Sequence, residues 1–216
     1  MKIDAINFTN IIINIAGTIE DNLDYLTELD TEIGDGDHGI NMAKGFKRIK
    51  EKLSEADILD IGETLILSGK VLLNEIGGAM GPLYGGGLIK AGMALKGKNT
   101  IYKNDIYTLF SSLLESVKSL GGARVGDKTM VDTLEPFVVE YRRQSEDNET
   151  VDSFREALAK AKEGMESTRD MISKVGRSSR LLERSKGHID VGAASSYLIL
   201  ESFYNSLKSI MDQQDN

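Results

Sequence analysis

One acidic stretch organises this sequence: Ile33-Gly34-Asp35-Gly36-Asp37-His38-Gly39-Ile40-Asn41, with Asp30 three residues before it. Three aspartates, a histidine and an asparagine fall here within twelve positions, and glycines alternate with the acids. Apolar residues at helical spacing precede the stretch and follow it at once. We therefore expect an acidic loop between two helices, with the composition typical of a metal site.

Asp30, Asp35 and Asp37 are the candidate metal ligands. Mg²⁺ prefers oxygen ligands in near-octahedral geometry, and it commonly takes a few carboxylates while water and substrate phosphate fill the other positions. Asp35 and Asp37 point the same way if the segment is extended. Gly34 and Gly36 permit the turn that brings the chain back to Asp30. A solvated acidic turn is the alternative interpretation, because Asp and Gly are common in turns for local reasons.

Length and composition predict one domain over residues 1–216. The chain is 40% apolar and 28% charged and contains no cysteine, which is ordinary for a globular protein. No apolar run approaches the roughly twenty residues of a membrane span, and the N-terminus lacks the basic and apolar parts of a secretory signal. The formal net charge of −8 argues against nucleic acid as a partner. We expect a cytoplasmic protein with no membrane or nucleic-acid partner.

Apolar residues recur at steps of three or four along most of the chain, which predicts an all-α fold. No segment shows the alternation of a strand over a useful length. The predicted helices run over residues 3–29, 42–53, 57–75, from 82 onward, 104–120, 128–141, 152–172 and 193–211. Because every unusual stretch lies between helices, we expect a bundle of eight amphipathic helices with the functional site at one end.

A second unusual stretch, residues 77–87, holds six glycines in eleven positions. That density argues against an ordinary helix interior, where each glycine costs about 1 kcal/mol relative to alanine. The glycines either form a loop close to a ligand or let two helices approach closely. We favour a loop for Gly77 to Gly81 and close packing for Gly85 to Gly87, since Pro82 suits the first position of a new helix.

Two further stretches have residues suited to phosphate. Residues 121–129 contain glycines and a lysine, but an aspartate interrupts the glycine-lysine pair that a Walker A loop requires, and a helix precedes them. Residues 176–190 gather three arginines and a lysine in an acidic chain. That composition fits a loop closing over polyphosphate and equally fits a mobile basic connector. The helix after the acidic loop adds the backbone N–H groups of residues 39–41.

The chain resembles, over nearly its whole length, the nucleotide-binding L subunit of phosphotransferase-type dihydroxyacetone kinases, which is similar to the C-terminal domain of the single-chain ATP-dependent kinases. Four motifs in the same order and spacing carry the resemblance. They are Leu29-Asp30 with residues 33–42, Gly77-Gly78-Ala79 with Gly81-Pro82-Leu83-Tyr84-Gly85, Gly126-Asp127-Lys128-Thr129-Met130-Val131-Asp132, and Glu183-Arg184-Ser185 with Gly187-His188-Ile189-Asp190. The resemblance implies a barrel of eight antiparallel amphipathic helices.

The resemblance also implies a function. ADP with two Mg²⁺ ions would stay bound as a carrier, receive a phosphoryl group from a phosphohistidine protein of the phosphoenolpyruvate phosphotransferase system, and pass it to dihydroxyacetone on a separate kinase subunit. Asp30, Asp35 and Asp37 are implied as magnesium ligands, and no residue serves as a nucleophile or general base. The implied nucleotide-binding positions are His38, Gly39, Ile40, Asn41, Ala79, Met80, Gly121, Met130, Arg177, Asp190, Val191 and Gly192.

Several residues depart from the family pattern. Met80 replaces a serine in the glycine-rich stretch, so this position has no hydroxyl for a phosphate, and Val191 replaces a proline. Arg180, Leu182 and Lys186 replace an aromatic residue, a glycine and an apolar residue. The metal ligands are unchanged, and the acceptor is expected to be dihydroxyacetone or another small ketose.

Two alternative functions stay open. In the first, the chain takes its phosphoryl group from free ATP, as the single-chain enzymes do, and its bound nucleotide exchanges rapidly. In the second, the chain is a regulatory module that holds ADP, transfers nothing, and docks on a transcription factor. The methionine at position 80 favours this second alternative.

Overall fold

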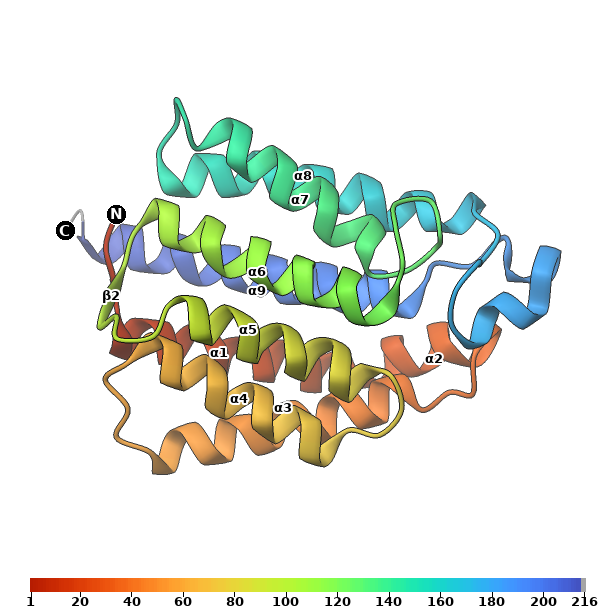
Figure 1. The fold of residues 1–216 in the computed structure, drawn as a ribbon, viewed down its shortest axis with the longest axis horizontal. Coiled ribbons are helices and arrows are strands. Elements are labelled where there is room, and N and C mark those ends of the chain that lie inside the picture. Colours follow the sequence, from red (N-terminus) through yellow and green to blue (C-terminus); the bar gives the residue numbers. More distant parts are fainter. Residues whose placement is uncertain (215–216) are drawn as a thin grey trace.

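The computed structural model describes residues 1–214 as an array of long helices that lie along one direction (Figure 1). The α-helices are α1 (Ala5–Asp21), α2 (Leu23–Ile33), α3 (His38–Glu55), α4 (Ile61–Glu75), α5 (Gly86–Ala94), α6 (Lys103–Gly121), α7 (Val131–Gln144), α8 (Thr150–Ser167) and α9 (Val191–Gln214). A π-helical turn (Gly81–Gly85) leads into α5, and 3-10 turns occupy Thr168–Asp170 and Arg177–Ser185. Two-residue strands β1 (Ile3–Asp4) and β2 (Thr100–Ile101) pair antiparallel. The prediction of an all-α fold is confirmed, because this short pair is the only strand structure within residues 1–214.

The described residues contain nine α-helices where the sequence predicted eight, because the helix expected over residues 3–29 is broken at Asn22. Asn22 has φ −104° and ψ 17°, and both its backbone N–H and its side-chain amide donate to the carbonyl of Thr18, at 3.2 and 2.8 Å. The apolar spacing continues across the break and therefore gives no sign of it. Asp30, expected at the end of the single long helix, lies in the last turn of α2.

Other predicted helix starts are also shifted, and two of these shifts have a clear local cause. α4 begins at Ile61 rather than at residue 57, since the Asp60 carboxylate accepts the N–H of Glu63 at 3.0 Å and caps the helix there. α7 begins at Val131 rather than at Lys128, because Lys128 has a φ of +62° that a right-handed helix does not allow. Each start is set by a local contact that the apolar spacing does not record.

The long helices pack in the order of the chain. The contacts join α1 to α3, α3 to α4, α4 to α5, α5 to α6, α6 to α7, α7 to α8 and α8 to α9, and α9 returns to α1. Buried apolar side chains from these helices form the core. It includes the rings of Phe110, Phe137, Phe154 and Phe203, whose contacting pairs have centroids 4.8 to 5.8 Å apart. Such aromatic pairs contribute roughly 0.5–1.5 kcal/mol each beyond the area they bury.

Glycines set the distance between α4 and the turn and helix that follow it. A Cβ atom at Gly69 would lie 2.5 Å from the carbonyl oxygen of Gly85, and one at Gly62 would lie 2.5 Å from the carbonyl oxygen of Gly92. The two backbones are therefore in direct contact, and the close packing expected at Gly85 is confirmed. This contact fixes the position of residues 76–80, which connect the two elements and contribute to the site.

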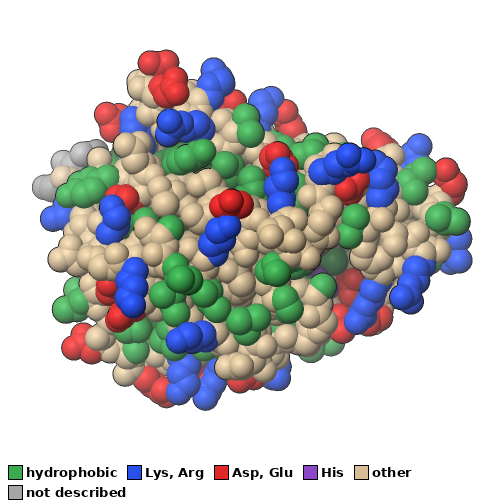
Figure 2. Space-filling model, in the orientation of Figure 1, with side chains coloured by type: hydrophobic (Ala, Val, Ile, Leu, Met, Phe, Trp, Pro, Cys, Tyr) green, Lys and Arg blue, Asp and Glu red, His purple; other side chains and the backbone are tan. Residues whose placement is uncertain are grey.

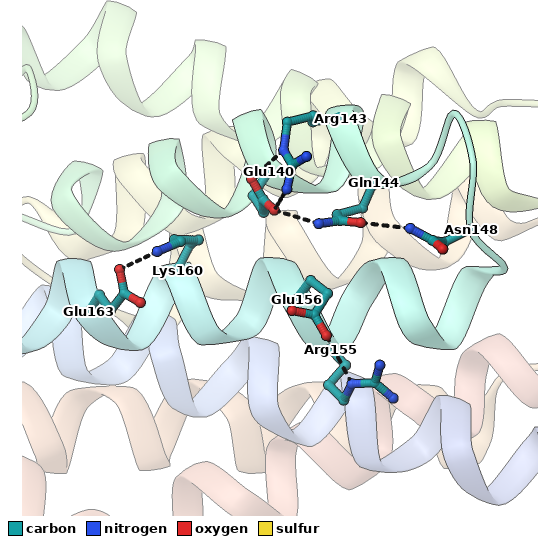
Figure 3. Close-up of polar contacts among 8 residues, drawn as sticks. All are labelled: Glu140, Arg143, Gln144, Asn148, Arg155, Glu156, Lys160 and Glu163. Carbon is teal, nitrogen blue, oxygen red and sulfur yellow. Dashed lines mark hydrogen bonds and ion pairs between the residues drawn. The ribbon is translucent and has the colours of Figure 1, made fainter.

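The outer face of α7 and α8 is charged and solvated (Figure 3). Glu140 accepts from Arg143 and from Gln144, and the Lys160 ammonium lies 2.6 Å from the Glu163 carboxylate. Pairs of this kind on exposed helix surfaces contribute only about 0.3–0.5 kcal/mol each. Within residues 1–214, no helix combines the length and the apolar character that crossing a bilayer requires.

Candidate functional site

Four segments that are distant in the sequence meet at one end of the helix array. They are the acidic loop (residues 34–37), the glycine loop (residues 76–80), the segment at the end of α6 (residues 121–131), and the basic segment (residues 176–190) with the start of α9. In Figure 1 this is the right-hand end, where α2 and the basic segment lie. Residues from all four segments line a cavity of about 510 Å³. The stretches that the sequence singles out therefore surround a single space.

The acidic loop brings three carboxylates together. Ligand atoms of Asp30, Asp35 and Asp37 all lie within 4.8 Å of one another. Asp30 is 8% exposed, and its Oδ2 accepts the backbone N–H groups of Asp37 (3.0 Å) and His38 (3.2 Å). A Cβ at Gly34 would lie only 2.0 Å from Asp30 Oδ1, so the chain can return over this carboxylate only with glycine at that position. Three hard oxygen donors within this distance suit Mg²⁺.

The first turn of α3 follows directly and presses against α2. A Cβ at Gly39 would lie 2.3 Å from the carbonyl oxygen of Leu23 and from Thr27 Oγ1. This packing explains the glycine and fixes the start of α3 beside the carboxylates. The first N–H groups of a helix have no partner within the helix, and the positive end of the helix dipole favours anions. Gly39 and Ile40 therefore present backbone donors next to the acidic loop, whereas the Asn41 N–H donates to the carbonyl of Asp37 at 2.9 Å.

The cavity wall contains most of the positions that the resemblance implies. These are Asp30, His38, Ala79, Met80, Gly121, Met130, Arg177, Asp190, Val191 and Gly192. Asp35 and Asp37 do not line the cavity itself and lie next to Asp30 at its edge. Residues 39–41 are likewise outside the lining. The geometry thus separates a polar edge, with the carboxylates and the start of α3, from the rest of the cavity.

The interior of the cavity has an apolar wall that sequence reasoning missed. It is formed by Leu83, Val117, Leu120, Ala123, Val131 and Val175. Leu83 and Val131 fall inside motifs of the family resemblance, although no role was assigned to them. The other four residues fit the apolar pattern of an ordinary helix or core, so their sequence gives no signal of a site. Leu120 is 59% exposed at the end of α6, which is unusual for a leucine on an amphipathic helix and shows only in the structure. An apolar wall beside a polar edge suits a ligand with a flat hydrophobic part and an anionic part.

Lys128 is the second feature that the sequence did not reveal. Its side chain is completely buried, and its ammonium donates to the backbone carbonyls of Thr168 and His188. Burial lowers the pKa of Lys128. Burial also raises the pKa of nearby Asp190 to about 6, while one oxygen of that carboxylate accepts the Ala193 N–H at 2.8 Å and caps α9. Lys128 thereby ties residues 121–131 to the basic segment.

The basic segment reaches across the cavity to the acidic loop. Arg177 forms an ion pair with Asp35, and His188 Nδ1 lies 3.5 Å from Glu32 Oε2 at the end of α2. Arg180, Arg184 and Lys186 are exposed. Figure 2 shows Lys and Arg side chains around this right-hand end, with acidic side chains beside them. Of the four basic side chains, Arg177 alone lines the cavity.

Together these features describe an all-α protein with a carboxylate cluster at the edge of a ligand-sized cavity. A sequence model of the DAK2 domain matches residues 32–205, and the chain belongs to this family. It is 35% identical over 210 residues to the ADP-binding subunit DhaL of PEP-dependent dihydroxyacetone kinase 2 from Listeria innocua, an alignment that covers 96% of this chain and 97% of that protein. It is 41% identical over 179 residues to the ADP-binding subunit DhaL of the PEP-dependent dihydroxyacetone kinase from Escherichia coli, covering 82% and 85%.

A solved structure has the same fold. The dihydroxyacetone kinase of C. freundii, crystallised in complex with AMP-PNP and Mg²⁺, matches with a TM-score of 0.73 and 25% sequence identity. The match covers 92% of this chain and 33% of that chain. The present chain therefore spans about a third of that larger kinase and nearly the whole length of the Listeria subunit.

Proposed function

We propose that this chain is the ADP-binding subunit of a phosphoenolpyruvate-dependent dihydroxyacetone kinase. Bound ADP would receive a phosphoryl group from a phosphohistidine phosphotransferase protein and pass it to dihydroxyacetone, or another small ketose, on a partner kinase subunit. The observation that carries the proposal is the cluster of three carboxylates, within 4.8 Å of one another, at the edge of a cavity of about 510 Å³. The subunits from Listeria innocua and Escherichia coli support it through their similarity over most of the chain.

Asp30, Asp35 and Asp37 would hold two Mg²⁺ ions. When bound, such ions neutralise the phosphate oxygens and position them, which is most of what phosphoryl transfer needs from a protein. The N–H groups of Gly39 and Ile40 lie beside the carboxylates and would donate to the phosphates. Arg177, now paired with Asp35, carries a planar set of donors that suits phosphate oxygens. No side chain of the site has to act as a nucleophile.

The remaining positions would hold the nucleoside. Gly121 and Met130 belong to the same wall as the apolar side chains of α6 and α7, which suits a flat base. Ala79 and Met80 of the glycine loop and the turn at residues 190–192 close the other sides. Met80 supplies no hydroxyl, so the phosphate contacts in this proposal come from backbone N–H groups and Arg177.

The helix order supports the architecture that the family resemblance implies. We propose that the contacts running from α1 through α9 and back to α1 close a barrel of eight helices, with α2 as a short addition at the site end. In this arrangement residues 1–216 form one domain. The site then lies where the acidic loop, the glycine loop and the start of α9 meet at one rim of the barrel.

Native mass spectrometry of the protein as purified tests the function. A mass increment of ADP with two Mg²⁺ is expected, and Asp35→Asn and Asp37→Asn should each lose it, because a bound dication tolerates the loss of a charged ligand poorly. Asp57→Asn, in an exposed position before α4, is the matched control and should retain the increment. An apo mass that takes up ATP only on addition would favour the exchanging kinase. No nucleotide under any condition would contradict both enzyme functions.

Arg177→Ala separates a binding role from a structural role of the arginine. This variant should weaken nucleotide binding while the apo protein keeps its melting temperature, since the side chain is 60% exposed. Thermal unfolding of the apo protein and ADP titration measure the two effects. A large drop in the apo melting temperature would assign Arg177 to the stability of the fold instead.

A further inference from the structure

Three walls of the cavity meet at a buried cluster of polar side chains, in which Tyr84, Ser195 and Ser196 have no role in the proposed function. Tyr84 belongs to the π-helical turn that follows the glycine loop, His38 opens α3, and Ser195 and Ser196 lie in the first turns of α9. The exposed fractions are 4% for Tyr84, 6% for His38, 0% for Ser195 and 1% for Ser196. The cluster therefore connects three separate elements out of contact with solvent.

The hydroxyl of Tyr84 is the centre of this cluster. It lies 2.7 Å from Ser195 Oγ, 3.0 Å from Ser196 Oγ and 3.3 Å from the carbonyl oxygen of Gly192. Ser195 Oγ in turn lies 3.0 Å from His38 Nε2 and 3.2 Å from the same carbonyl of Gly192. A single chain of hydrogen bonds thus runs from the turn after the glycine loop, through the start of α9, to the start of α3.

Each end of this chain of hydrogen bonds lies next to a group that faces the proposed ligand. The backbone N–H of His38 donates to the carboxylate of Asp30, and His38 directly follows Asp37. Gly192 closes the turn at residues 190–192, and Tyr84 follows Gly81 in the turn after the glycine loop. A shift of any member therefore moves one wall of the cavity relative to the other two. Buried hydrogen bonds between uncharged groups are directional and rigid.

The environment keeps the central hydroxyl uncharged. Burial raises the pKa of Tyr84 to about 12, so this side chain is neutral at pH 7. It can exchange hydrogen bonds with the serines without any buried charge. The cluster is suited to holding positions and not to transferring protons.

We infer that Tyr84, Ser195 and His38 are positioning residues, which hold the acidic loop, the glycine loop and the turn at residues 190–192 at the spacing that a magnesium-bound nucleoside diphosphate requires. The inference rests on the proposed function. It adds Tyr84 and Ser195, to which that function gives no role, and it gives His38 a positioning role beside its implied place at the nucleotide. Their effect is on affinity for the assembled ligand, because only that ligand contacts all three walls together.

Tyr84→Phe tests the inference, since it removes the central hydroxyl and keeps the ring. Calorimetric titration with ADP, with and without Mg²⁺, should show an affinity for the magnesium complex that is about 5- to 20-fold weaker than that of the wild type, the range expected for losing a buried hydrogen-bonding group. Affinity for ADP without Mg²⁺ should change much less. Ser195→Ala removes the hydroxyl shared by Tyr84 and His38 and should reproduce the effect.

Tyr141→Phe is the matched control. Tyr141 is 1% exposed, and its hydroxyl donates to the carbonyl of Lys103 at 3.3 Å, near the end of α7 that lies away from the site. It should lower the melting temperature by a similar amount and leave affinity for the magnesium complex unchanged. Equal affinity loss in Tyr84→Phe and Tyr141→Phe, or none in Tyr84→Phe and Ser195→Ala, would overturn the positioning role alone. A wild-type protein that binds no ADP with Mg²⁺ would overturn the proposed function and this inference with it.

Discussion

At the scale of single residues, Leu182 has the backbone conformation least suited to its side chain. It has φ 51° and ψ −126° within the basic segment, a region that glycine adopts at little cost and other residues at about 1–3 kcal/mol. Its side chain is 68% exposed, so little packing offsets this strain. We expect Leu182→Gly to raise the free energy of unfolding by about 1 kcal/mol, after the greater chain entropy of glycine is subtracted. Urea unfolding measures the change, and Leu182→Ala, which keeps the Cβ, should show no comparable gain.

Asp190 predicts a pH dependence. Its carboxyl has a pKa raised from 3.8 to about 6 by burial, so the folded protein favours the protonated form. The stability that this group contributes is fully present below pH 3.8 and is lost as the pH rises through about 6. Asp190→Asn imitates the protonated form and still offers an acceptor to the Ala193 N–H. At pH 7 the variant should be more stable than wild type by about 1–2 kcal/mol, a figure reduced because the cavity admits solvent to this residue.

Denaturant unfolding at pH 4 and pH 7 checks the direction of this pH dependence of stability. The difference between Asp190→Asn and wild type should be small at pH 4 and largest at pH 7, with no nucleotide or metal added. A difference that is largest at pH 4 would contradict the assignment of the raised pKa. The attraction of the Lys128 ammonium for the Asp190 carboxylate works against the rise in pKa without reversing it.

These residues show how far the sequence predicts the site. The acidic cluster was predictable because its geometry is local: Gly34 and Asp30 are four positions apart, and the required turn can be read from residue types. The role of Lys128 was not, since it depends on the carbonyls of Thr168 and His188, which lie 40 and 60 positions from it. A lysine that donates only to backbone carbonyls leaves no complementary acid for a pattern to detect.

At the scale of helices, α7 and α8 pack against each other closely where α7 contains a proline and α8 contains a glycine. Pro136 has no N–H, so the carbonyl of Asp132 has no donor four residues further along α7. A Cβ at Gly164 of α8 would lie 1.9 Å from that carbonyl oxygen. In the structure, α8 approaches this carbonyl closely enough to exclude every side chain at position 164. Periodicity predicts such a helix but cannot predict which face of its neighbour it touches.

Gly164→Ala should therefore destabilise the protein, although alanine favours helices. The added methyl group would overlap the carbonyl oxygen of Asp132, and this backbone cannot rotate away. The free energy of unfolding should therefore fall by about 1–3 kcal/mol net. The Asp132 carboxylate accepts the N–H groups of Gly126 (2.6 Å) and Thr129 (2.8 Å), so displacement of Asp132 should also weaken nucleotide binding. Urea unfolding and ADP titration measure both effects.

Gly17→Ala provides the control on α1. Gly17 lies in the interior of that helix, and a Cβ there would meet no atom within 4 Å. The same substitution should stabilise the protein there by up to about 1 kcal/mol through helix propensity alone. If both variants were more stable than wild type, the close contact between Gly164 and Asp132 would not limit the stability of the protein.

At the scale of the whole molecule, the core stabilises the folded chain, whereas the charges of the site destabilise it. The aromatic core is complete within the described residues, while the site end gathers three carboxylates within 4.8 Å in a protein of net charge −8. Like charges at this distance repel, and Arg177 contributes one positive charge beside them. The folded protein without a cation should therefore be less stable than its core allows.

Adding Mg²⁺ and ADP should recover that stability. A ligand present at 100 times its dissociation constant adds about 2.7 kcal/mol to a folded protein that alone binds it, which for a chain of this size raises the melting temperature by about 5–10 °C. Thermal unfolding with EDTA, Mg²⁺ alone, ADP alone and both together should show the largest rise for the pair, because the carboxylates hold the metal and the cavity holds the nucleotide. Asp35→Asn should melt slightly higher than wild type in EDTA, since one repelling charge is gone, and should lose most of the rise with the pair. A rise of equal size with ADP in EDTA would show that the carboxylates do not hold a metal for the nucleotide.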